Sequence, residues 1–123
     1  MIDAVPIVRI GTNLLVPLRG DLEDSSVERI EQDVTRVVAD TRATGVLVDV
    51  SGLAVVDSYV ARVIARLVAM IRLLGAQTAV VGIQPAVAIA LVELGVPMGG
   101  VFTALNAEQG MARLRRLSDE HLE

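Results

Sequence analysis

Several residue types are absent from this sequence of 123 residues, and each absence excludes a kind of chemistry. With no cysteine, the chain has no disulfide, thiolate metal site or cysteine nucleophile. With no lysine among its 11 basic residues, it offers neither a Schiff base nor a phosphate-loop lysine. Phe102 and Tyr59 are its only Phe, Tyr or Trp rings, too few to stack on the bases of a nucleic acid. The net charge of −4 also argues against a nucleic-acid partner, because phosphate backbones require a basic face.

A long uninterrupted apolar run is missing as well. Residues 79–105 are mostly apolar, but Gln84, Pro85, Glu93, Pro97 and four glycines interrupt them. A helix that crosses a bilayer needs roughly 20 largely uninterrupted apolar residues. The first residues also lack the basic-then-apolar pattern of a signal peptide. We therefore expect no membrane partner and a cytoplasmic location.

The most informative stretch lies near the middle of the chain. Residues 46–50 are apolar apart from Asp49, rich in valine, and flanked by glycines, which predicts a buried strand. A turn follows, and Asp57 and Ser58 then precede an apolar-periodic segment over residues 60–74. Asp and Ser favour helix starts because their side-chain oxygens accept hydrogen bonds from unpaired backbone N–H groups. The pattern predicts a strand, a turn and a helix, with a serine hydroxyl where the helix begins.

The rest of the chain alternates apolar strands with helical patterns. Further strands are expected over residues 7–10, 14–18, 78–81 and 101–105, and further helices over residues 25–41, 86–94 and from 107 to near the end. Such alternation is typical of a parallel sheet with crossover helices. The whole chain, residues 1–123, is expected to form one α/β domain with a mostly parallel sheet of about five strands and four helices.

Local signals refine these elements. Pro17 cannot donate to a sheet ladder, so it indicates an edge position or a bulge. Asp24 or Ser25 is expected to cap the first helix, Pro85 to occupy the first position of the third, and Asn106 to cap the last.

The second helix, expected over residues 58–74, is apolar around most of its circumference. Only Arg62, Arg66 and Arg72 interrupt its apolar residues. A helix of this kind is either packed on several sides or docked on a partner. We expect its outer face to form part of a protein interface.

Few residues offer chemistry of their own. The lone His121 lies in a polar tail, where a solvated residue is expected. Asp49 lies near the end of a buried strand, a common ligand position in α/β folds, but we favour a structural role in which it bonds turn N–H groups around Gly52. Ser58, taken alone, is most often part of a cap worth about 1 kcal/mol. A phosphate on Ser58 would face the positive end of the helix dipole, so phosphorylation is physically tolerable there. No metal or cofactor site is expected.

The stretch from Asp49 to Ala61, followed by Gly82-Ile83-Gln84-Pro85-Ala86-Val87-Ala88 and Glu93-Leu94-Gly95, resembles the STAS domain family of sulphate transporters and anti-sigma factor antagonists. Within that family, the sequence resembles more specifically the RsbS-type scaffold subunits of the bacterial stressosome. It implies a STAS fold in which Ser58 is phosphorylated by a serine/threonine switch kinase of the RsbT type. It also implies that Asp57 and Tyr59 cap the helix or contact that kinase.

The resemblance further implies co-assembly with RsbR-type sensor subunits, dephosphorylation by an RsbX-type phosphatase, and a homodimer within a large hetero-oligomer. Sensor subunits carry a sensory domain before the STAS fold and usually threonine at the modified position. The start of this sequence and its serine therefore favour the scaffold.

The expected function is a non-enzymatic scaffold that holds the kinase until Ser58 is phosphorylated during the stress response. The alternative within the fold is a free anti-sigma factor antagonist that binds an anti-sigma kinase directly and is switched off by the same modification. A rival of another class is an enzyme that uses Asp49 and Ser58, although no basic residue stands beside Ser58 in the sequence to activate it.

Overall fold

The structure, a computed structural model, describes residues 6–53, 57–95 and 101–122, with side chains placed as far as residue 119. The elements in these ranges are β1 (Val8–Ile10), β2 (Asn13–Gly20), α1 (Asp24–Thr41), β3 (Gly45–Leu53), α2 (Ser58–Leu73), β4 (Gln77–Val81), α3 (Pro85–Glu93), β5 (Val101–Ala104) and α4 (Ala107–Leu122). The five strands form one sheet in sequence order. Only the β1–β2 pair is antiparallel. The expected α/β fold is confirmed.

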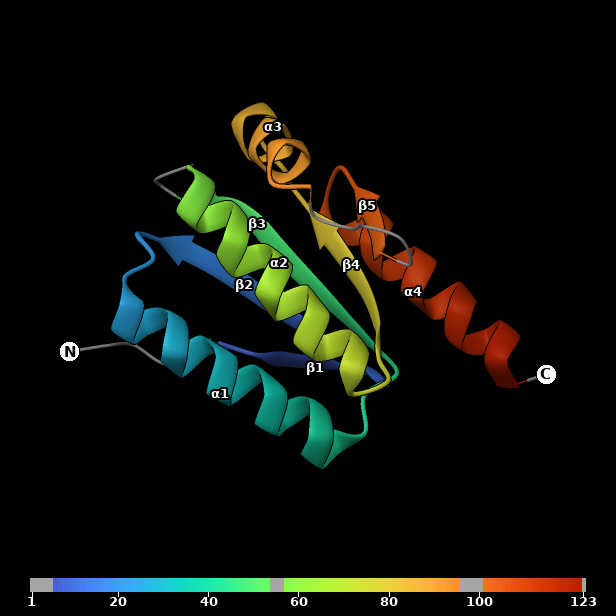
Figure 1. The fold of residues 1–123 in the computed structure, drawn as a ribbon. Helices are drawn as coiled ribbons and strands as arrows, with labels where there is room; N and C mark the ends of the chain where they lie inside the picture. Colours follow the sequence, from blue (N-terminus) through green and yellow to red (C-terminus); the bar gives the residue numbers. More distant parts are fainter. Residues whose placement is uncertain (1–5, 54–56, 96–100, 123) are drawn as a thin grey trace.

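The helices lie in two layers (Figure 1). From β2 to β5, each strand pairs in parallel with the next strand of the chain. Every crossover therefore moves to the neighbouring strand in the same direction across the sheet. Right-handed crossovers that all step one way place their helices on one face, so α1, α2 and α3 share a core with that face. The last helix, α4, packs on the opposite face against Leu47, Ala79 and Val81.

Two local expectations are refined. The central strand β3 does not stop at Gly52 but continues to Leu53, because Gly52 still pairs with Arg19 of β2. Pro17 lies in an inner strand, yet beyond Leu15 β2 has no partner on the β1 side among the described residues. The register between β2 and β3 also shifts between Pro17 and Arg19. Both features accommodate a residue without an N–H.

The expected cap of the first helix is wrong. The N-cap of α1 is Glu23, which holds an extended backbone and makes no side-chain cap bond. Asp24 is the first residue of the helix, and its carboxylate accepts a hydrogen bond from Tyr59 instead of capping α1. At the other helix starts, Pro85 opens α3 as expected, and Asn106 Oδ1 accepts from the Gln109 N–H at 2.9 Å.

The second helix uses its apolar surface within the chain. Seven of its residues are buried: Val60, Ala61, Val63, Ile64, Leu67, Val68 and Ile71. They pack among the sheet, α1 and α3, so α2 is covered on several sides. Its exposed residues are Ser58, Arg62, Arg66, Ala69, Arg72 and Leu73. The first and third helices cover the apolar surface of α2 and leave mainly arginines outside, so the apolar pattern does not indicate a partner. An interface on the outer face of α2 stays a prediction.

Candidate functional site

The sequence-predicted site lies at the edge of the sheet where the parallel strands end. The registered pair Gly20 and Leu53 closes β2 and β3 at this edge, and α1 and α2 both begin beside it (Figure 1). Because both helices start here, their N-termini bring two sets of unpaired N–H groups to one end of the molecule. The residues 54–56 of the resembling motif lie outside the described residues.

Asp57 is the N-cap residue of α2. Its backbone is extended, with φ −145° and ψ −175°, and its Oδ1 accepts a hydrogen bond from the Val60 N–H at 3.0 Å. Ser58 follows as the first helical residue, and it is exposed. The cap therefore fixes the backbone from which the Ser58 hydroxyl projects.

Tyr59 ties the start of α2 to the start of α1. Its hydroxyl donates a 2.8 Å hydrogen bond to Oδ1 of Asp24. That bond stabilises the neutral phenol and is the main reason that the pKa of Tyr59 is raised above 10.0. Desolvation and the negative charges of Asp24 and Glu31 raise the pKa further, while the positive charge of Arg62 acts in the opposite direction.

Charge at this edge is mostly negative. Asp21, Glu23 and Asp24 are exposed in and after the loop that enters α1, and Asp57 adds a carboxylate at the start of α2. Arg62 is the basic residue of α2 nearest to Ser58 in sequence, four residues further along the helix and exposed. Residues four apart share a helix face, with an acidic group N-terminal to a basic one as the favoured order. Sequence reasoning had missed Arg62 as a site residue, although this spacing is visible in the sequence.

A salt bridge fixes α1 and α2 further along. Arg66 Nε lies 2.7 Å from Oε2 of Glu31, whose side chain is only 11% exposed. This contact holds the two helices together two turns beyond Ser58.

The structure does not combine Asp49 with Ser58. Asp49 Oδ1 accepts hydrogen bonds from the Ser51 N–H at 3.0 Å and from the Ser51 hydroxyl at 2.7 Å. Asp49 lies two residues after Leu47 on β3 and therefore shares its face of the sheet, which packs against α4 and is opposite to α2. The Ser51 N–H is the backbone group just before Gly52, so the structural role expected for this carboxylate is confirmed, with the Ser51 hydroxyl as an additional donor.

The described residues show neither a metal centre nor a membrane-spanning helix. No group of three or more His, Asp or Glu residues in these ranges is placed to hold a metal ion. No helix within residues 6–53, 57–95 and 101–122 combines the length and apolar character needed to cross a membrane. The side chain of His121 lies outside those described.

The fold and this edge define a class of protein: a small α/β domain with a single parallel crossover layer, a capped helix after its central strand and an exposed serine at that cap. Over residues 4–117 the sequence matches the family model of the STAS domain. The chain belongs to the STAS family.

Comparison with solved structures narrows the likeness. The fold is similar to that of RsbS from Moorella thermoacetica carrying the substitution S58E, with a TM-score of 0.83 and 32% identity over 95% of this chain and 99% of that one. It is also similar to a chain in the structure described as the molecular architecture of the stressosome, a signal integration and transduction hub. That match has a TM-score of 0.74 and 32% identity, and it covers 92% of this chain and 98% of the other.

A sequence relative and a further solved structure also match most of this chain. The chain is 29% identical over 120 residues to the RsbT co-antagonist protein RsbRA of Bacillus subtilis, which covers 97% of this chain and 44% of RsbRA. It therefore spans less than half the length of that relative. The anti-sigma factor antagonist SpoIIAA, solved in its unphosphorylated form, shares the fold with a TM-score of 0.72 at 17% identity, over 92% of this chain and 97% of SpoIIAA.

Proposed function

We propose that this chain is a non-enzymatic scaffold subunit of a stressosome. In this role it co-assembles with RsbR-type sensor subunits, holds a serine/threonine switch kinase of the RsbT type, and releases the kinase when Ser58 is phosphorylated. The observation that carries the proposal is the likeness to RsbS, which extends over 95% of this chain and 99% of that one. The likeness to RsbRA, a co-antagonist of RsbT, supports the choice of kinase and of sensor partner.

Ser58 is the residue on which the switch is proposed to act. Its exposure at the capped start of α2 gives a kinase access to the hydroxyl without unfolding the helix. The Moorella RsbS in the comparison carries S58E, a carboxylate introduced at a serine of the same number. The kinase supplies ATP, Mg²⁺ and the catalytic base, so the scaffold contributes only a hydroxyl and a docking surface.

The added charge is what makes phosphorylation a switch. A phosphoserine carries about −1.5 to −2 charges at neutral pH and three strong acceptor oxygens. In the free chain the phosphate meets the N–H groups at the start of α2 and the guanidinium of Arg62, which offset the repulsion from Asp57. A kinase docked over this edge would have to desolvate the phosphate and separate it from Arg62. Phosphorylation therefore favours the free form of the chain.

Tyr59 and Asp24 have a positioning role in this proposal. Their hydrogen bond holds the first turns of α1 and α2 together, so a partner meets one rigid surface on both sides of Ser58. A phosphatase of the RsbX type would restore the hydroxyl and reset the switch. The assembly itself is proposed to be a homodimer of this chain within a larger hetero-oligomer.

The experiment combines the full chain, its sensor partner and its kinase. Size-exclusion chromatography should give a large assembly that contains all three proteins, and addition of ATP should release the kinase. Peptide mass spectrometry should then find the phosphate on Ser58. The matched control is Ser25→Ala, which removes an exposed serine from the first turn of α1, whereas Ser58→Ala should abolish release.

The free antagonist predicts a different result. A small complex of this chain with the kinase alone, and no co-elution with a sensor subunit, would replace the scaffold by an anti-sigma factor antagonist of the SpoIIAA kind. Turnover of a small molecule by the isolated chain would favour an enzyme instead.

A further inference from the structure

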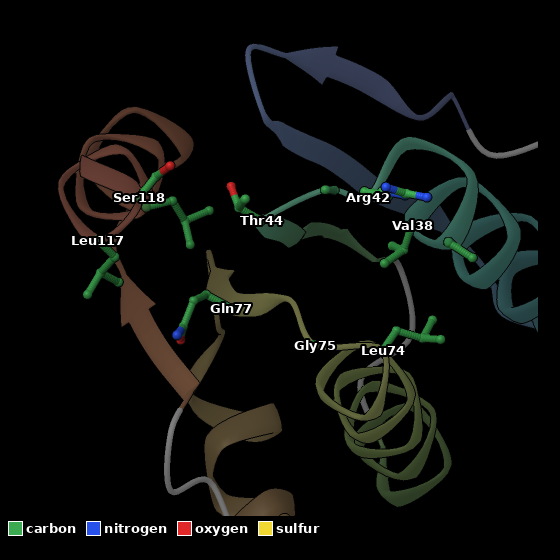
Figure 2. A pocket seen from close by; sticks show the side chains of 11 residues that line it. Val38, Arg42, Thr44, Leu74, Gly75, Gln77, Leu117 and Ser118 are labelled. Atoms are coloured by element: carbon green, nitrogen blue, oxygen red, sulfur yellow. The ribbon is translucent and has the colours of Figure 1, made fainter. Parts of the chain in front are cut away.

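A cavity of about 480 Å³ lies at the other end of the sheet, where β3 and β4 begin. Figure 2 shows Val38 and Arg42 from the end of α1, Leu74 from the end of α2, and Leu117 and Ser118 from α4 around it. The start of α2, with Ser58, is 16 residues away along that helix, so the cavity is separate from the site described above. Its volume falls in the range of small-molecule pockets.

The cavity is lined by both apolar and polar groups. The apolar lining consists of Val38, Ala39, Ala43, Leu74, Leu114 and Leu117. The polar lining consists of Arg42, Thr44, Gln77 and Ser118. A pocket that combines apolar side chains with a few polar groups fits an amphiphile, whose chain contacts the apolar side chains and whose head group contacts the polar ones.

The backbone conformation of Arg42 is unfavourable for a residue other than glycine. It is the C-cap residue of α1, with φ 53° and ψ 42°, and it is the only non-glycine residue with positive φ among those described. Glycine is the residue that this left-handed position favours, because it has no Cβ to clash. The chain instead keeps an arginine there, at the rim of the cavity (Figure 2). A residue held in a disfavoured backbone conformation is a candidate for a functional role.

Arg42 has no ion-pair partner among the side chains that the structure describes. No Asp or Glu whose side chain is described lies within ion-pair distance of its guanidinium, although Arg29, Arg36 and Arg66 all have such partners. Among the described residues, Arg42 is also the only charged one that lines the cavity. The ends of α1 and α2 bring partial negative charge nearby, but a full guanidinium charge outweighs these dipole ends and can pair with a carboxylate through two hydrogen bonds.

From these observations we propose that the cavity binds a medium-chain monocarboxylate. The carboxylate pairs with Arg42 at the mouth, assisted by the hydroxyl and amide groups of the rim. The hydrocarbon chain lies against the leucines of α2 and α4. This inference does not depend on the proposed role of Ser58.

The test uses octanoate and the full chain, with binding measured by calorimetry and located by backbone amide shifts. Octanoate should bind and shift the amides of Thr44, Gln77 and Ser118. Octylamine, with the same chain and the opposite charge, should bind at least about tenfold more weakly. Absence of octanoate binding, or equal binding of octylamine, would overturn the proposal.

Arg42→Gly separates the ligand role from a structural role. It should weaken octanoate binding by about tenfold or more while raising the melting temperature, because glycine relieves the left-handed backbone. Arg42→Gln should weaken binding to a similar degree without that gain in stability. The matched control Arg72→Gln removes an exposed arginine that does not line the cavity and should bind octanoate like the unaltered chain. If Arg42→Gly binds octanoate as tightly as the unaltered chain, the assignment of Arg42 is wrong.

Discussion

The hydroxyl of Tyr59 lies 2.8 Å from Oδ1 of Asp24, and this hydrogen bond joins the first turns of α1 and α2 directly beside Ser58. It connects two residues 35 positions apart in the sequence, and each stands at the start of its helix. The bond explains why Asp24 does not cap α1 and why the pKa of Tyr59 is raised.

This bond predicts a titration that can be followed at one residue. Tyr59 is the only tyrosine and the chain has no tryptophan, so ultraviolet absorbance reports its ionisation alone. The midpoint should lie above 10.0 and fall towards that value in Asp24→Ala, because the hydrogen bond to Asp24 is the largest cause of the shift. Since the pKa is raised in the folded chain, the stabilisation is present below about pH 10 and lost as the pH rises through the folded value. The control Glu28→Ala should leave the midpoint unchanged, and an unchanged midpoint in Asp24→Ala would contradict the account.

The cap at Asp57 predicts a defined loss of stability. Asp57→Ala removes the acceptor for the Val60 N–H and should lower the free energy of unfolding by about 1 kcal/mol. Urea unfolding followed by circular dichroism measures this change. Asp57→Asn keeps a side-chain oxygen and should lose much less. Equal losses in the two variants would show that the cap bond is not the cause.

Arg62 should be detectable as the partner of a phosphate on Ser58. Phosphorus NMR of the phosphorylated chain reports the second pKa of phosphoserine, which is about 6 when unperturbed. Arg62→Gln should raise that pKa by about 0.3, because a favourable charge pair at this spacing is worth about 0.2–0.5 kcal/mol. Arg66→Gln is the control, since Arg66 already pairs with Glu31. If both variants give the same pKa as the unaltered chain, Arg62 does not receive the phosphate.

The close packing of α4 on the sheet predicts the effect of a single methyl group at Gly110. A Cβ there would lie 2.7 Å from Cγ1 of Val81 and 2.8 Å from Cδ1 of Leu47. The clash should cost about 1–3 kcal/mol, which exceeds the gain of up to about 1 kcal/mol from the better helix propensity of alanine. Gly110→Ala should therefore lower the melting temperature. Gln109→Ala, at the exposed neighbouring position, should not, and a stabilised Gly110→Ala would mean that α4 can shift away from the sheet.

Sequence reasoning predicted the fold where local signals and tertiary packing agree. The valine-rich run of residues 46–50 and the start of α3 at Pro85 both depend on short-range chemistry that the sequence displays. The continuation of β3 past Gly52 could not be predicted in this way, because it depends on pairing with Arg19 of another strand.

At the candidate site, too, local features could be predicted from the sequence and tertiary contacts could not. The position of Asp57 and Ser58 at a helix start follows from residue types and spacing. The bond from Tyr59 to Asp24 spans two helices and leaves no local trace in the sequence. The packing of α1 and α3 over α2 also depends on tertiary structure and cannot be read from local sequence. For this reason the apolar circumference of α2 suggested a partner, although helices of the same chain cover it. Arg62 could have been found from its spacing to Ser58 alone.

The central claim is that a charge on Ser58 releases the kinase, and calorimetric titration of the kinase into three forms of the chain tests it most directly. Ser58→Asp places a carboxylate at the exposed start of α2, so it should bind the kinase at least about tenfold more weakly than the unaltered chain while keeping its melting temperature. Ser58→Ala should bind as tightly as the unaltered chain and keep the kinase bound when ATP is added. Equal affinities of Ser58→Asp and the unaltered chain would contradict the account, because charge at this position would then not be the release signal.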